Sequence, residues 1–475
     1  VTANIERAAG QHAVVVEIGQ RECLEPLVIE LDLKELEGLT DALEDIELLE
    51  IGAIPAPSMP PMVHRLPEAT IVSPVDPPPL PLAEVGDRRI VYHQKSGEAG
   101  LRLQIVDSTR TTSAITPVYV MSPFGSLEIE GWDRDWILVS AEIEIAAESS
   151  DEADALAERI DLRIHNKSNA VYVETVLPQL TDPQTRVVSA NIEIKVPTDN
   201  PLNCRNSHGR VYVAGFTNGV KLNANHCDVR VRGIVGGVEV VNSMGRLIIS
   251  DVSGRMELRN AYELLEVSRC KGPMTIENTF ARIELSNCSG NVRVRNSGAV
   301  DVSDHTGNLE IDNNNGLVMV RSLEGNLQVA SSLHPVVIEN IRGSAGLENV
   351  RGAIRIDGVE GPLAASSVHG SITASALSGP LHLVSSNGMI DLALDRPIVG
   401  QSSIMSDYGN IKLKLKESSD LLLTVEALGG DIQSAFPFPI RKTDSSHTSR
   451  IELGRMVGSL DVSARGADVV ISTTR

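Results

Sequence analysis

The chain has 475 residues, enough for two or three domains that each bury a core. Its formal net charge of −21 repels phosphate backbones and argues against a nucleic-acid partner. With only 5 Phe, 2 Trp and 6 Tyr, the chain has few rings to fill a wide core, which favours a fold that stacks thin layers.

The apolar runs of the chain bear on membrane insertion and on export. No run reaches the roughly 18 residues of a membrane span, so no transmembrane segment is predicted. The stretch Ala13–Ile18 is short and contains Glu17, so no signal peptide is visible. Because the chain begins at Val1, either a signal was removed or the start codon was written as valine. We expect a cell-surface or secreted protein, with the cytoplasm as the alternative.

Residues 1–52 are predicted to form a small acidic α/β segment, with a strand at 13–18 and an amphipathic helix at 33–50. Residues 53–85 carry ten prolines between Pro55 and Pro81. This composition predicts a stiff polyproline II linker, and a ligand for a signalling module is the alternative.

Residues 86–200 are predicted to be a β-rich entry region. Two alternating stretches, 126–130 and 137–145, flank Gly131–Asp135 and predict a hairpin, in which Trp132 and Trp136 either anchor the end of the fold or form a contact patch. Ser149 or Ser150 is expected to cap a helix that runs to about Ile160. Further strands are expected at Ile164, 170–176 and 190–196.

From residue 201 to the C-terminus the pattern predicts an all-β fold, a single-stranded parallel β-helix (β-solenoid) of 17–18 residues per rung. Its regular rungs span 219–388, and 467–472 is expected to be a last strand that caps the stack. Within each unit, apolar residues follow the glycine at offsets of about 2, 4, 11, 13 and 16, which disfavours the left-handed hexapeptide helix. Starting from Gly219, the repeat glycines are Gly237, Gly254, Gly272, Gly290, Gly307, Gly325, Gly343, Gly361 and Gly379.

Asparagine recurs at one corner of the repeat. Stacked rungs about 4.8 Å apart would align these side chains into a ladder whose amides bond along the stack. The expected ladder comprises Asn242, Asn260, Asn278, Asn296 and Asn313. Glycine at the other corners allows a positive φ where the chain turns sharply.

Four segments resemble the bacterial family of repetitive β-strand proteins named putative adhesins. They read SLEIEGWDRDWILVSAEIEI, SSDEADALAERID, VSANIEIKVPTDNPLN and SAFPFPI, and the resemblance covers about residues 120–475. It implies a β-helix and surface adhesion. The acidic segment and linker at 1–85 and the missing signal peptide depart from the family pattern.

Candidate chemistry is sparse, and no catalytic residue, metal site or cofactor site is predicted. Cys270, Cys288 and His305 fall in one inward column, which could hold a metal or a redox pair but is better explained as core packing. The five cysteines, which also include Cys23, Cys204 and Cys227, lack the CxxC spacing of a zinc ribbon. Outward charges are expected to pair across rungs. They are Glu277, Arg282, Glu284, Arg293, Arg295, Asp301 and Glu310.

The sequence therefore predicts a non-enzymatic solenoid that binds a protein or matrix partner. An intracellular scaffold that polymerises end to end is the first alternative. A polysaccharide-cleaving β-helix enzyme is the second, and it would require carboxylates clustered in a groove.

Overall fold

The computed structural model describes residues 2–6, 15–19, 88–94, 100–110, 113, 115–176, 186–416 and 419–473. Contacts divide the chain into two units, Val1–Pro78 and Pro79–Arg475. In the first unit, β1 (Thr2–Glu6) and β2 (Val15–Gly19) pair antiparallel, and β2 overlaps the strand predicted at 13–18. The predicted helix at 33–50 and the linker at 53–85 lie outside the described residues.

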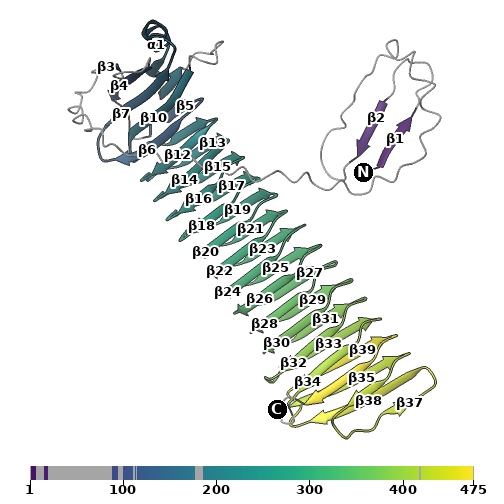
Figure 1. Ribbon diagram of the computed structural model, residues 1–475. Coiled ribbons are helices and arrows are strands. Elements are labelled where there is room, and N and C mark those ends of the chain that lie inside the picture. Colours follow the sequence, from purple (N-terminus) through teal and green to yellow (C-terminus); the bar gives the residue numbers. More distant parts are fainter. Residues whose placement is uncertain are drawn as a thin grey trace, which may run out of the picture. The chain divides into compact units, whose positions relative to one another are not determined.

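The second unit is a parallel β-solenoid of about 12 turns (Figure 1), which confirms the predicted fold class. Each rung contributes one strand to an odd-numbered sheet and one to an even-numbered sheet. The odd sheet contains β11 (Leu202–Asn206), β13 (Val220–Asn225), β15 (Val238–Ser243), β17 (Met256–Ala261), β19 (Met274–Thr279), β21 (Val292–Asn296), β23 (Leu309–Asn313), β25 (Leu327–Ser331), β27 (Ala345–Asn349), β29 (Leu363–Ser367), β31 (Leu381–Ser385) and β33 (Gly400–Asp407). The even sheet contains β12 (Gly209–Ala214), β14 (Cys227–Arg232), β16 (Leu247–Ser250), β18 (Leu265–Ser268), β20 (Ile283–Ser289), β22 (Val300–Thr306), β24 (Val318–Glu324), β26 (Val336–Ile341), β28 (Ile354–Val359), β30 (Ile372–Leu377), β32 (Ile390–Leu394) and β34 (Ile411–Leu415).

A rung has a third, shorter side, which explains the fifth apolar position of the repeat. In β24, Val318 and Val320 point inward and are buried. Ser322 then adopts a left-handed conformation (φ 57°), which bends the chain so that Leu323 also points inward. Most residues at this bend are Gly, Asp or Asn, the residue types that best tolerate a positive φ. The bend residues are Gly215, Gly233, Asp251, Arg269, Asn287, Asp304, Ser322, Asn340, Gly358 and Ala376.

The first rung of the stack comes from the entry region. β5 (Val118–Ser122) and β6 (Ser126–Trp132) pair in parallel with β11 and β12. The predicted hairpin between 126–130 and 137–145 is wrong, because β10 (Arg186–Pro197) lies between β6 and β7 (Trp136–Ala146). β10 pairs parallel with β6 and antiparallel with β7, so its 12 residues separate the two strands that a hairpin would have joined.

Antiparallel strands and one helix complete this end. β3 (Arg89–Gln94) pairs with β4 (Gly100–Arg110), β4 pairs with β7, and β8 (Asp161–Lys167) with β9 (Ala170–Val176). The predicted helix is α1 (Ser150–Ala157), and its N-cap is Ser149, whose hydroxyl accepts a hydrogen bond from the Glu152 amide at 3.3 Å. No helix in the described ranges is long and apolar enough to cross a membrane.

The C-terminal strands do not follow chain order. β39 (Gly458–Arg465) lies between β33 and β35 (Leu421–Leu428), and β40 (Val469–Thr473) lies between β34 and β36 (Ile432–Ser434). The prediction that 467–472 caps the stack is therefore wrong, because the last strand of the sequence is internal. The outer end of the odd sheet is formed by β38 (Ser446–Leu453), antiparallel to β35, and by β37 (Arg441–Lys442).

Candidate binding groove

Glycines line one corner of the stack, where successive rungs approach each other closely. A Cβ on Gly272 would lie 2.2 Å from the carbonyl oxygen of Gly254, and Gly272 has a φ of +123°. Gly237 lies one residue beyond this column, and Gly236 occupies its place, because Val238 is in register with Met256. The column comprises Gly236, Gly254, Gly272, Gly290, Gly307, Gly325, Gly343, Gly361 and Gly379.

The five predicted asparagines are stacked in register and buried. Their amides bond mainly to the turn three residues ahead: Asn260 Nδ2 donates to the Glu263 carbonyl at 2.7 Å, and Asn313 Nδ2 to that of Gly316 at 2.9 Å. A bond along the stack joins Asn242 Nδ2 to Asn260 Oδ1 at 3.1 Å. Four of the five amides thus bond to their own turn, whereas the buried side-chain amide of Asn278 has no hydrogen-bond partner among the described residues. The column continues as Ser331, Asn349, Ser367, Ser385 and Ser406.

A second asparagine column, on the outside, does bond along the stack. The Oδ1 of Asn291 accepts the amide N–H of Asn308 at 3.3 Å, and that of Asn308 accepts the amide of Asn326 at 3.2 Å. Asn326 Oδ1 in turn accepts the amide of Ser344 at 3.1 Å. Sequence reasoning missed these residues, although each follows a repeat glycine directly.

Cys270, Cys288 and His305 lie on successive rungs and are buried. The pKa of the Cys270 thiol is raised by its hydrogen bond with Cys288 and by burial, so it is protonated. His305 Nε2 lies 2.9 Å from the Gly290 carbonyl, and burial lowers the pKa of its imidazole, which keeps the ring neutral. The described part of the chain contains no group of three or more His, Cys, Asp or Glu side chains that could hold a metal ion.

The outward charges form ion pairs between rungs. Glu277 lies between Arg259 and Arg295, at 2.9 and 3.4 Å. Asp301 likewise lies between Arg282 and Arg321, at 3.0 and 2.8 Å. Arg282 also contacts Glu284, and Arg293 contacts Glu310. All are partly exposed, so each contributes at most about 1 kcal/mol to stability.

The tryptophan cluster packs locally at the entry end. The rings of Trp132 and Trp136 meet edge to face with centroids 4.5 Å apart, and Trp132 Nε1 donates to the Trp136 carbonyl at 2.7 Å. The guanidinium of Arg134 lies over both rings, 5.0 Å and 5.6 Å from their centroids. These contacts close the short connection from β6 to β7.

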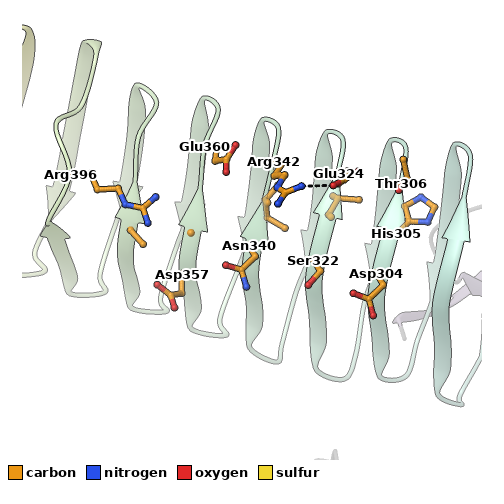
Figure 2. Close-up of a pocket in the computed structure, with 14 residues that line it drawn as sticks. Asp304, His305, Thr306, Ser322, Glu324, Asn340, Arg342, Asp357, Glu360 and Arg396 are labelled. Carbon is orange, nitrogen blue, oxygen red and sulfur yellow. Dashed lines mark hydrogen bonds and ion pairs between the residues drawn. The ribbon is translucent and has the colours of Figure 1, made fainter.

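A polar groove of about 780 Å³ runs along the bend of the rungs, from β22 to β30 (Figure 2). Figure 2 shows one row of side chains from the left-handed bend, with Asp304, Ser322 and Asn340. The opposite row contains Thr306, Glu324, Arg342 and Glu360, and Arg396 reaches the groove from the connection after β32. The bend creates the groove: every rung bends at the same position, so the outer surface of the stack is concave there.

The groove can form hydrogen bonds and ion pairs with a polar ligand. Glu324 is paired with Arg342 at 2.5 Å, and Asp357 accepts a hydrogen bond from the Ser375 hydroxyl at 2.9 Å. Its lining contains Asp304 and Glu360 as further carboxylates and no Phe, Tyr or Trp. Sequence reasoning did not find this site, because its residues come from six rungs and share no motif.

Comparison with known proteins identifies the family of the chain. A family model described as Toastrack DUF4097 matches residues 140–455. The chain belongs to this family, which confirms the predicted resemblance to a family of repetitive β-strand proteins. A solved structure from Clostridium sporogenes, named "putative cell adhesion protein", is 9% identical; the alignment covers 78% of this chain and 99% of that chain, with a TM-score of 0.15. No curated protein matches the sequence.

Proposed function

We propose that this protein is a non-enzymatic rod that binds a protein or matrix partner through its outer face, at the cell surface or after secretion. The observation that carries the proposal is the groove of Figure 2, an open polar surface shared by six rungs. The core beneath it consists of packed apolar side chains, so the rungs hold the groove residues at fixed spacing.

The groove chemistry favours binding over cleavage. A glycosidase acid must reach the bond that it protonates and be free to transfer the proton. Here Glu324 is held by Arg342, and Asp357 is engaged by Ser375. The two other carboxylates of the lining, Asp304 and Glu360, lie three rungs apart, about 14 Å along the rod, which is too far for an acid and base that flank one bond. The lining also offers no aromatic platform for a sugar ring. The enzyme alternative predicts hydrolysis of a polysaccharide that is lost in Asp357→Asn and Glu360→Gln, and turnover of any glycan in a panel would contradict the proposal.

The ends of the stack bear on the alternative of a polymerising scaffold. End-to-end growth requires an open strand edge. At the C-terminal end the outermost strands are β36 and β37, of three and two residues. β36 and β37 offer few unpaired backbone groups. The rest of the odd-sheet edge is β38, which runs antiparallel to β35 and does not continue the parallel rungs, so this end favours a single rod. The location of the protein is tested by fractionating the native cells.

The binding test uses the full chain on immobilised cell-envelope and matrix fractions. We expect saturable binding that falls in Arg342→Ala and Glu360→Ala. The matched control is Arg293→Ala, which removes another exposed, ion-paired arginine, from the odd sheet. Equal loss in the control, or no binding to any fraction, would contradict the proposal.

A further inference from the structure

A second groove, of about 380 Å³, lies on the even sheet across β6, β12, β14 and β16. Arg210, Arg230 and Arg246 line it, and all three are exposed. Among the described residues, none of these arginines contacts a carboxylate. Asp228 lies between Arg210 and Arg246 in register, but its Oδ1 accepts the backbone N–H of Arg246 at 3.1 Å.

The arginines of the middle rungs differ from these three. Between residues 250 and 345 every arginine contacts an acidic side chain. They are Arg255, Arg259, Arg269, Arg282, Arg293, Arg295, Arg321 and Arg342. Described arginines without a carboxylate partner occur again beyond residue 345, but Arg210, Arg230 and Arg246 differ from those in lining one groove together, although the chain as a whole is strongly acidic.

Apolar and ring surface lies between these charges. Tyr212 and Ile248 flank Arg230 in register, and both are half-buried in the same groove. On the adjoining corner the rings of His208 and His226 stack with centroids 4.9 Å apart, and Met244 is 50% exposed. The groove thus combines donors for oxyanions with surfaces that can contact the apolar face of a sugar ring.

We propose that this groove binds an acidic polysaccharide, a linear chain that carries carboxylate or sulfate groups. The inference rests on the proposed binding function and names the ligand class. Each guanidinium can donate paired hydrogen bonds to one oxyanion. Rungs lie about 4.8 Å apart, so Arg210 and Arg246, two rungs apart, present donors about 9.6 Å apart along the rod. An extended polymer engages several such sites at once.

Nucleic acid fits the groove less well. The phosphates of nucleic acid are closely spaced. The net charge of −21 therefore repels nucleic acid more strongly than it repels a polysaccharide whose acidic groups are farther apart. Stacking of successive bases would also require exposed ring faces. The His208 and His226 rings instead face each other.

The test measures binding of the full chain to polygalacturonate, dextran sulfate, neutral dextran and single-stranded DNA by calorimetry at low and moderate salt. We expect binding to one or both acidic glycans, weakening with salt, and none to dextran. Polygalacturonate and dextran sulfate distinguish carboxylate from sulfate recognition. In the triple variant Arg210→Gln/Arg230→Gln/Arg246→Gln we expect the affinity to fall more than about tenfold.

The matched control is Arg255→Gln/Arg259→Gln/Arg293→Gln, which removes the same charge from arginines that have carboxylate partners and line neither groove. It should retain its affinity within about threefold, and circular dichroism should show both variants folded. Equal loss in both variants, equally tight binding of DNA, or no binding to either glycan would overturn the inference. Glycan affinity that is unchanged in the triple variant, together with envelope or matrix binding that still falls in Arg342→Ala, would overturn this inference alone and leave the proposed function standing.

Discussion

Glycines at adjoining positions of the repeat can carry very different constraints. Gly272 has a positive φ, and a Cβ there would lie 2.2 Å from the Gly254 carbonyl oxygen. Gly237 offers ordinary space, because a Cβ there would meet the Arg255 carbonyl oxygen at 3.9 Å. The corner column therefore tolerates no side chain, whereas the adjoining position does.

We expect Gly272→Ala to lower the free energy of unfolding by about 2–4 kcal/mol, because both the backbone strain and the steric overlap are new. Gly237→Ala, the control, should change it by less than about 1 kcal/mol. Thermal and urea unfolding, with hydrogen exchange at β17 and β19, measure the difference. Similar destabilisation by both substitutions would contradict the role of the column.

Among the described residues, His305 gives the core a pH-dependent group. Burial lowers the pKa of its imidazole, so the unfolded state binds more protons than the folded state as the pH falls. Its contribution to stability is therefore fully present above about pH 6.5, the unfolded value, and is lost progressively below it.

We expect His305→Leu, which copies Leu323 of the next rung, to remove the part of the stability loss that occurs between about pH 7 and pH 5. The measurement is the unfolding midpoint as a function of pH. His334→Leu, which replaces an exposed histidine two rungs farther along the stack, is the control and should retain the wild-type profile. If the wild type and His305→Leu have parallel profiles, protonation of His305 does not limit stability.

At the scale of elements, the last two strands of the chain are structural partners for two different rungs. β39 and β40 separate the rung of β33 and β34 from that of β35 and β36. Residues 458–473 must therefore be present before the rung of β35 and β36 can join the stack.

Removal of residues 456–475 should abolish hydrogen-exchange protection in β35 and β36 and reduce it in β33 and β34. The reason is that both rungs lose their parallel neighbour at once. A chain that ends at Thr473 is the control and should keep full protection. Fraying confined to a single rung would mean that the final strands lie at the end of the stack.

At the scale of the whole second unit, each rung contacts its neighbours along one axis, so stability is shared between adjacent rungs. With about 12 turns at about 4.8 Å per rung, the regular stack is expected to be roughly 58 Å long. Electron microscopy of the full chain should show single rods of at least this length. Chains of rods joined end to end would favour the polymerising scaffold instead.

The sequence by itself determined the local and periodic features. The glycine spacing, the alternating apolar offsets and the Ser149 cap all report on contacts within a rung or with an identical neighbour, so the fold class and α1 could be predicted. The repeat also located the buried Asn and Cys–His columns, because register follows from period.

Only the tertiary structure decided which non-repeating strands meet. The insertion of β10 between β6 and β7, and of β39 and β40 inside the stack, depends on pairing between segments far apart in the chain, which no local pattern encodes. The same holds for both grooves. Their side chains come from several rungs, and whether an arginine such as Arg210 or Arg293 has a carboxylate partner is settled by the neighbouring rungs and not by the residues beside it in sequence.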